Sequence, residues 1–218
     1  MAKKIGVLLS GCGVFDGAEI HESVITLLKL DQAGAEVTAI APDISQLKVV
    51  NHSKGEDVSE SRNVLEEASR ISRGEIKSVS DVKAVDFDAL IIPGGFGAAL
   101  NLCNFAVKGP EGEVDADVQA LIKDFYDSKL PIGAMCIAPA LVALSLPEAG
   151  LKLTIGNDPG VASGIGALGH EHVECPTSGV VIDEENKVVT TPAYMTAGGI
   201  AEAYEGISKL VDKVLQIS

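Results

Sequence analysis

One of the four cysteines, Cys136, lies where a strand-like run of residues meets a helix-like run. Residues 132–135 are apolar and suit a buried strand, and residues 138–144 suit a helix. A nucleophile elbow holds its nucleophile on a sharp turn between a strand and a helix, and needs small residues two positions before and after it. Ala134 and Ala138 occupy those positions. The spacing predicts a thiol over a helix N-terminus, where the helix dipole favours the thiolate, although a buried, inert cysteine fits it equally well.

A glycine-rich run, PGGFG at residues 93–97, follows another apolar run and supplies a second part of such a site. Gly94 and Gly95 allow the backbone to turn sharply and to bring an N–H group close to a ligand. We predict that the N–H groups of Gly95 and Ile137 form an oxyanion hole beside the thiol. Without a reactive thiol nearby, the same glycines would only make a tight turn.

The elements that must position these residues alternate between strand and helix patterns. Almost continuous apolar runs indicate strands covered on both faces, as in a parallel sheet, at residues 5–9, 37–41, 89–92 and 132–135. Amphipathic helix patterns occupy residues 19–32, 61–73, 115–128 and the C-terminal part of the chain. This alternation predicts an α/β fold: one domain over residues 1–218, doubly wound and flavodoxin-like, with a mostly parallel sheet and helices on both faces.

After Pro147 the pattern changes to shorter strand-like runs at residues 151–155, 179–182 and 187–191. The last two are separated by a polar turn, and they predict a small C-terminal hairpin. At the start of the first predicted helix, Asp16 and Glu19 indicate a capping pair.

Composition and charge limit the class of protein. Hydrophobic residues make up 46% of the chain and charged residues 22%, so the chain can bury a large core. The formal net charge of −14, without a basic cluster, argues against nucleic acid or an anionic membrane as a partner. No run approaches the roughly 20 apolar residues of a membrane span. The N-terminal run suits a buried strand better than a signal peptide. We therefore expect a cytoplasmic protein, or one of an organelle lumen after removal of a transit peptide.

Metal and cofactor sites find little support in the sequence. The cysteines lie far apart, with neither a CxxC pair nor the ligand spacing of a zinc site, so we expect no metal and no disulfide framework. His170 and His172 could form a His-x-His metal pair, but an exposed loop pair is the preferred interpretation. The loop SGCGVFDG resembles a dinucleotide-binding loop, but its glycine spacing is one residue too long. We expect no cofactor.

Several motifs together carry a family resemblance over residues 4 to about 215: IIPGGFGAALN, GAMCIAPA, SGCGVFDGAEIHE and ESRNVLEEASRISRG. The chain resembles the class I glutamine amidotransferase-like superfamily, in the branch of PfpI and the parkinsonism-associated protein. Within that branch it is most similar to the ElbB glyoxalase family, also known for enhancing lycopene biosynthesis. The resemblance implies that the elbow cysteine works with a glutamate of the first helix, which is Glu22 here. It also implies a small aldehyde substrate and a homodimer.

The residues alone give a different interpretation of Glu22. On a helical wheel it lies nearly opposite the apolar stripe of Ile20, Val24 and Leu27, which predicts a solvated surface charge. With the resemblance, Glu22 becomes the expected proton partner of Cys136, and Glu19 remains a cap.

Two departures from the related enzymes bear on the activity. PfpI-type peptidases place a histidine directly after the cysteine, where this chain has Ile137. Amidotransferases carry a His-x-Glu pair after a late strand, where this chain has Pro192 and Ala193. Peptidase and glutaminase activities are therefore disfavoured. The preferred hypothesis is a cofactor-free glyoxalase acting on small 2-oxoaldehydes, and the alternative is a slow or non-catalytic cysteine-based redox sensor or binding module linked to isoprenoid metabolism.

Overall fold

The computed structural model describes residues 2–218, and its centre is a seven-stranded sheet. Within these residues, all strands of the sheet run parallel except β10, which pairs antiparallel with β11. In spatial order the strands are β10 (Val181–Asp183), β11 (Val188–Thr191), β7 (Ile132–Met135), β6 (Ala89–Ile92), β1 (Lys4–Leu8), β2 (Glu36–Ala41) and β5 (Ile76–Ser78). Strands are added first on one side of β1 and then on the other, so the winding direction reverses between β1 and β6. In such sheets, ligands bind beyond the carboxyl ends of the strands at this reversal.

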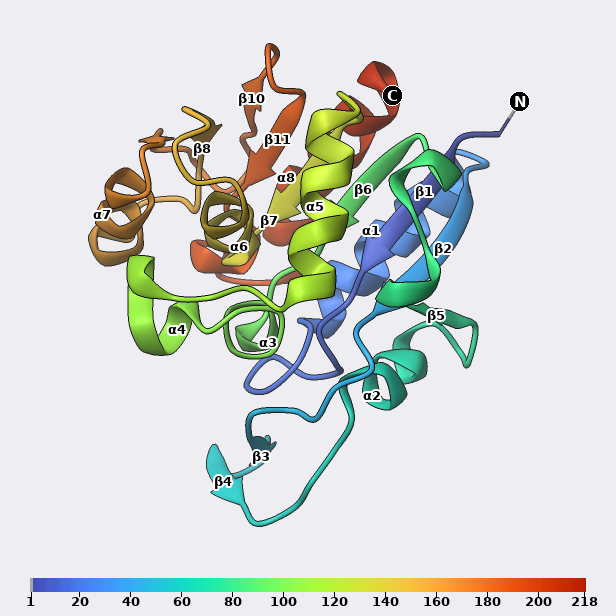
Figure 1. Ribbon diagram of the computed structural model, residues 1–218, viewed down its shortest axis with the longest axis vertical. Coiled ribbons are helices and arrows are strands. Elements are labelled where there is room, and N and C mark those ends of the chain that lie inside the picture. Colours follow the sequence, from blue (N-terminus) through green and yellow to red (C-terminus); the bar gives the residue numbers. More distant parts are fainter. Residues whose placement is uncertain (1) are drawn as a thin grey trace.

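Helices cover both faces of the sheet (Figure 1). One face carries α1 (Ile20–Gln32), α2 (Val64–Ile71) and α8 (Ile200–Ile217), and the other carries α5 (Ala116–Asp127) and α6 (Ala138–Ser145). Each face has its own buried apolar cluster. In β6, Leu90 and Ile92 belong to one cluster and Ala89 and Ile91 to the other, because successive strand side chains point to opposite faces. This is why the central strands are apolar throughout.

Shorter elements complete the chain. They are the helices α3 (Phe96–Leu100), α4 (Phe105–Lys108) and α7 (Pro159–Ala167), the strands β3 (Val49–Asn51), β4 (Glu56–Val58), β8 (Lys152–Leu153) and β9 (Glu171–His172), and the 3-10 turns η1 (Val79–Asp81), η2 (Ala84–Asp86), η3 (Gly109–Glu111) and η4 (Ala193–Met195).

The predicted α/β fold with a mostly parallel sheet, helices on both faces and a C-terminal hairpin is confirmed. The predicted strand at residues 151–155 is wrong in extent, because only β8 forms there and it pairs with β9 outside the main sheet. The β3–β4 hairpin and β5 were not predicted. These strands have three residues each, which is too short for an alternating pattern to stand out.

The apolar stripe of α1 faces mostly away from the sheet, although Leu27 is half-buried against the core. Ile20, Val24 and Leu28 are 43–49% exposed. The buried residues of α1 are Glu22, Ser23, Ile25, Thr26 and Leu30. The predicted surface position of Glu22 is therefore wrong, because the helix docks on the sheet through its more polar side.

The start of α1 is capped by Glu19 alone. The side chain of Glu19 accepts a hydrogen bond from the backbone N–H of Glu22 at 2.7 Å, which confirms the capping role of Glu19. Asp16 is not part of the cap: its carboxylate accepts from the N–H of Val50 at 2.7 Å and ties the β3–β4 hairpin to the loop after β1.

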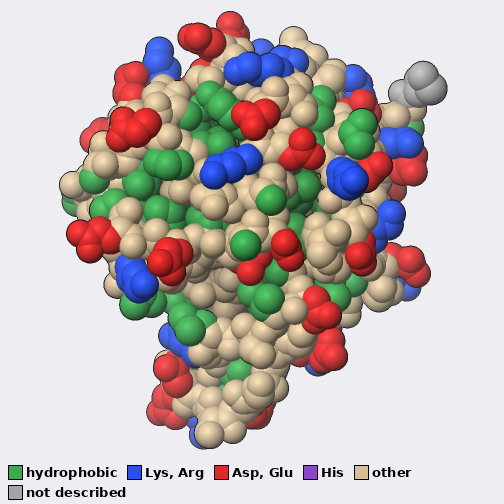
Figure 2. Space-filling model, viewed as in Figure 1, with side chains coloured by type: hydrophobic (Ala, Val, Ile, Leu, Met, Phe, Trp, Pro, Cys, Tyr) green, Lys and Arg blue, Asp and Glu red, His purple; other side chains and the backbone are tan. Residues whose placement is uncertain are grey.

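The surface carries both signs of charge. Figure 2 shows acidic and basic side chains interspersed over the viewed face, without a gathered basic patch. In the part of the chain that the structure describes, no helix combines the length and the apolar character that crossing a bilayer requires.

Candidate active site

The turn after β7 has the strained geometry of a nucleophile elbow. Cys136 has a backbone φ of 59°, in the left-handed region that residues with a side chain seldom adopt. Its N–H donates to the carbonyl of Thr191 at the end of β11, at 3.0 Å. Gly94 faces the turn so closely that a Cβ there would lie 2.4 Å from the Cβ of Cys136. The turn therefore requires glycine at position 94 as well as small residues around the cysteine.

Glu22 meets Cys136 at this turn. Its side chain is fully buried, and its two carboxylate oxygens accept backbone hydrogen bonds from Gly94 at 2.8 Å and Tyr194 at 3.2 Å. The sulfur of Cys136 lies beside the same carboxylate: a Cβ on Gly94 would be 2.9 Å from both the sulfur and Oε2 of Glu22, and each group affects the pKa of the other. The structure thus brings together the two residues that the sequence analysis paired, from elements 114 positions apart in the chain.

Burial controls the electrostatics of the pair. Removal from water raises the pKa of Glu22 to about 7, against the opposing effect of its hydrogen bonds. Burial and the neighbouring Glu22 charge raise the pKa of the Cys136 thiol well above its usual range, although the N–H groups of Gly95 and Ile137 lower it. The expectation that the helix dipole favours the thiolate is therefore wrong at this site. Burial raises the pKa of the thiol more than the N–H groups of Gly95 and Ile137 lower it, so the thiol keeps its proton.

The N–H groups of Gly95 and Ile137 both point toward the sulfur of Cys136 closely enough to affect its pKa. Neither N–H has a backbone acceptor among residues 2–218. Gly95 has a φ of 90°, and a Cβ there would lie 2.4 Å from the N atom of Glu19. The two groups are placed so that they can donate to an oxygen bound next to the sulfur.

Comparison with known proteins identifies the family. The profile described as the DJ-1/PfpI family matches residues 12–211. The chain belongs to the DJ-1/PfpI family. This family lies within the class I glutamine amidotransferase-like superfamily and includes proteases and glyoxalases.

Relatives that match nearly the whole of this DJ-1/PfpI chain include two mammalian proteins and one protein of known structure. The rat "ES1 protein homolog, mitochondrial" is 42% identical, over 99% of this chain and 84% of its own length. The human "Glutamine amidotransferase-like class 1 domain-containing protein 3, mitochondrial" is also 42% identical, over 100% and 84%. A crystal structure from Ehrlichia chaffeensis, described as an isoprenoid biosynthesis protein with an amidotransferase-like domain, superposes with a TM-score of 0.93 at 36% identity, over 99% of both chains. The names of the two mammalian relatives place them in mitochondria, so they give the expectation of a cytoplasmic protein no support.

The remaining sequence candidates of this DJ-1/PfpI protein lie outside the Cys136–Glu22 pair. His170 is buried rather than exposed, and its ring nitrogens contact the N–H of Leu151 and the carbonyl of Ala143, both at 3.1 Å. His172 accepts from the N–H of Ile155. Among residues 2–218, no group of three or more His, Cys, Asp or Glu side chains is arranged to hold a metal ion. Both histidines serve local structure.

Two contributors were missed by sequence analysis. Thr191 contributes its carbonyl to the elbow, and Tyr194 contributes its N–H to Glu22. Every residue type except proline carries both groups, so no signal in the side chains could have found these positions.

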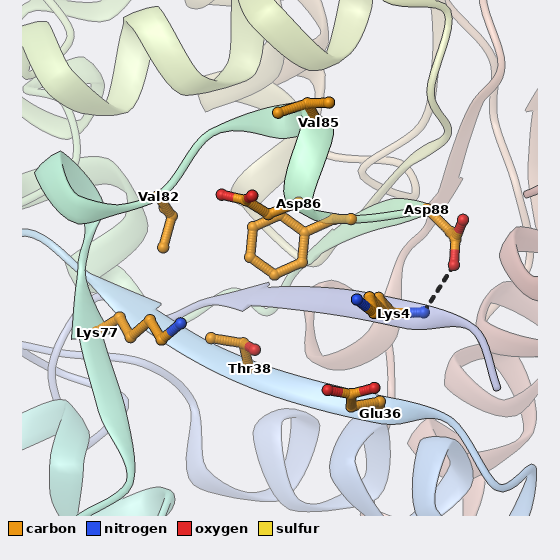
Figure 3. Close-up of a pocket in the computed structure, with 9 residues that line it drawn as sticks. Lys4, Glu36, Thr38, Lys77, Val82, Val85, Asp86 and Asp88 are labelled. Carbon is orange, nitrogen blue, oxygen red and sulfur yellow. Dashed lines mark hydrogen bonds between the residues drawn. The ribbon is translucent and has the colours of Figure 1, made fainter.

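A cavity of about 420 Å³ lies at the opposite end of the sheet (Figure 3). Its walls mix lysines with carboxylates and come from β1, β2, β5 and the segment before β6: Lys4, Glu36, Thr38, Lys77, Val82, Val85, Asp86, Phe87 and Asp88. None of the residues of the Cys136 site lines this cavity, so its size is no guide to the chemistry.

Proposed function

We propose that this protein is a cofactor-free, glyoxalase III-like enzyme that converts small 2-oxoaldehydes, such as glyoxal and methylglyoxal, to 2-hydroxy acids. One observation carries the proposal: the thiol on the elbow lies beside a buried carboxyl group whose pKa is raised to about 7. A carboxyl group with this pKa can both take and return a proton near neutral pH, which is what an isomerisation by proton transfer needs.

The first step is addition of the thiol to the aldehyde. Glu22 takes the thiol proton as the sulfur of Cys136 bonds to the aldehyde carbon, and the C=O electrons move onto oxygen. The N–H groups of Gly95 and Ile137 stabilise that oxyanion. Proton transfer from Glu22 to the oxygen completes a hemithioacetal and restores the carboxylate.

The second step moves hydrogen between the two carbons. Glu22 removes the proton from the carbon that bears sulfur, and returns it to the neighbouring carbon of the enediol. At the same time the hydroxyl proton on the first oxygen passes to the second, so that the first carbon becomes the thioester carbonyl and the second carries the hydroxyl group. The product is a 2-hydroxy thioester on Cys136. Water then cleaves the carbon–sulfur bond, which releases the 2-hydroxy acid and restores the thiol. The overall reaction adds one water molecule to the 2-oxoaldehyde, without an external oxidant or reductant.

The side chains around the elbow favour this reaction over amide hydrolysis. Cleavage of an amide needs a general acid to protonate the departing amine. Ile137 follows the cysteine and Pro192 follows β11, so neither position that carries histidine in the related hydrolases has one here. The glyoxalase reaction expels no amine and uses Glu22 alone as acid and base.

The wild-type protein tests this function directly. We expect chelator-treated, glutathione-free protein to convert methylglyoxal to lactate, because neither step needs a metal or a second thiol. Proton NMR of the reaction mixture follows both compounds. Lactate formation no faster than in a buffer blank would refute the proposal.

The alternative of a redox sensor finds less support in the geometry. Thiol oxidation follows thiolate character and exposure. Cys136 is only 8% exposed, and its pKa is raised by burial. The words "isoprenoid biosynthesis" describe the Ehrlichia chaffeensis relative, and a role in that metabolism stays part of this second proposal.

We also propose that two copies of the chain pair through the outward side of α1 and α8. The two helices pack against each other. Lys29 contacts Asp212 at 3.3 Å in their carboxyl-terminal parts, and His21 at the start of α1 contacts Tyr194, in the segment before α8, at 2.7 Å. Among residues 2–218, five of the ten exposed large apolar side chains lie on these two helices: Ile20, Val24, Leu28, Ile200 and Tyr204. An apolar stripe shared by two helices suits a self-complementary contact.

This pairing predicts a dimeric wild-type protein and a monomeric Val24→Glu variant in sedimentation equilibrium, because a buried charge would oppose the contact. Val107→Glu is the matched control, since Val107 is exposed on α4, away from this surface. A monomeric wild-type protein, or dissociation by both variants alike, would contradict the proposed contact.

A further inference from the structure

The segment that follows β11 contacts both members of the reactive pair. The carbonyl of Thr191, the last residue of β11, accepts the N–H of Cys136 at 3.0 Å. Three residues later, the N–H of Tyr194 donates to Glu22 at 3.2 Å. The relative placement of thiol and carboxylate therefore depends on the path of the chain between these two residues.

That path is strained at Ala193. This residue is fully buried and has a φ of 44°, in the left-handed region, although it is not glycine. Pro192, with its restricted φ, precedes it. Strained backbone persists where the surrounding structure imposes it, and it is concentrated at functional sites. Here the unusual turn directs the next N–H group, that of Tyr194, at the carboxylate of Glu22.

The side chain of Tyr194 ties the same segment to α1. Its hydroxyl group lies 2.7 Å from Nδ1 of His21, the residue directly before Glu22. Tyr194 thus contacts two consecutive residues of α1, one through its side chain and the other through its backbone.

We propose that residues 192–194 are the positioning element of the site, with Tyr194 as a positioning residue whose backbone N–H determines how readily Glu22 accepts the thiol proton. The inference rests on the proposed function for its catalytic meaning. The Tyr194 N–H donates to the carboxylate of Glu22, so it acts on the carboxylate rather than on the substrate.

The electrostatics of Glu22 support this role. The hydrogen bond from Tyr194 is the largest of the effects that lower the pKa of Glu22 against the dominant effect of burial. The titratable groups around the carboxylate are Glu19 and His21 on its own helix, Cys136 after β7, and the Tyr194 hydroxyl. Of these, Glu19 raises the pKa of Glu22 through its charge.

Two substitutions at Ala193 distinguish an effect of the direction of the Tyr194 N–H group from an effect of packing. Ala193→Gly keeps the left-handed turn without strain. Ala193→Val places a β-branched side chain in a conformation it strongly disfavours, which should turn the Tyr194 N–H away from Glu22. Loss of a hydrogen bond to a charged carboxylate should raise the pKa of that group by roughly one unit or more. We therefore expect the Glu22 midpoint to move up by about one unit in Ala193→Val and to stay near the wild-type value in Ala193→Gly.

The measurement is a carbon-13 NMR titration of protein labelled at the glutamate carboxyl carbons, with the Glu22 signal assigned by its absence in Glu22→Gln. Equal midpoints in wild type and a folded Ala193→Val would overturn the proposal, and so would equal shifts in both variants. If Ala193→Val does not fold, the wild-type Tyr194 amide proton decides. It should titrate with the Glu22 midpoint and become insensitive in Glu22→Gln, and an amide shift independent of Glu22 would refute the contact. No aldehyde is present, so the result is separate from any failure of the glyoxalase assay.

Discussion

Replacement of Cys136 by alanine is expected to lower kcat/KM for methylglyoxal by roughly 10³-fold or more, because the covalent route is lost entirely. The substitution should leave the fold intact, since alanine removes one buried sulfur without adding volume and the neighbouring Ala134 and Ala138 are already small. The hydrogen-bond donors of Gly95 and Ile137 remain, but they have no oxyanion to stabilise without the hemithioacetal. Initial-rate measurements on the purified variant, with circular dichroism to verify folding, check this result.

Cys12 and Cys175 provide the matched controls, because both are partly exposed thiols outside the elbow. Aldehydes add to any accessible thiol, so simple consumption of methylglyoxal does not identify the reactive residue. Cys12→Ala and Cys175→Ala should each retain nearly the wild-type rate of lactate formation. Equal losses in all three variants would show that the chemistry does not depend on the elbow.

Glu22→Gln is expected to remove catalysis and, at the same time, a pH-dependent part of the stability. The pKa of Glu22 rises from 4.5 in the unfolded chain to about 7 in the folded protein, chiefly through burial. Between these values the folded state holds a proton that the unfolded state has released. Wild-type stability from this group therefore falls as pH rises through the window, and above pH 7 the full cost of the buried charge remains.

Glutamine has no proton to lose, so its contribution is flat across this window. The free energy of unfolding of Glu22→Gln minus that of wild type should increase by about 2–3 kcal/mol between pH 5 and pH 8, from a folded pKa of about 7. Any constant cost of placing an amide between two N–H donors cancels in this difference. Urea unfolding at several pH values measures it.

Glu205→Gln, at an exposed position on α8, controls for the loss of one negative charge. Its stability difference from wild type should stay within about 0.5 kcal/mol across the same pH range, as is usual for surface substitutions. A pH-independent difference for Glu22→Gln would mean that the carboxyl group titrates alike in the folded and unfolded states. In that case its burial would not raise its pKa.

The sequence by itself determined the architecture and singled out Cys136 as the candidate nucleophile. Short, continuous apolar runs such as residues 89–92 suit strands covered on both sides, because successive side chains of a strand are buried on opposite faces. The spacing of Ala134, Cys136 and Ala138 indicates a tight turn, because the crowding in such a turn involves residues that are close in sequence. Both features follow from residues a few positions apart, which is the range over which sequence patterns carry physical information.

Only the tertiary structure decided how Glu22 and Cys136 behave. The helical wheel separates Glu22 from Ile20 and Val24, but an apolar stripe can face the sheet or the outside of the chain, and here Ile20 and Val24 face outward. Glu22 is tolerated in the interior because Gly94 and Tyr194, which follow it by 72 and 172 positions, donate to its two oxygens. The same burial keeps the thiol protonated, against the local expectation from the helix terminus. Desolvation depends on everything packed around a group, and that is a property of the folded chain rather than of any segment of it.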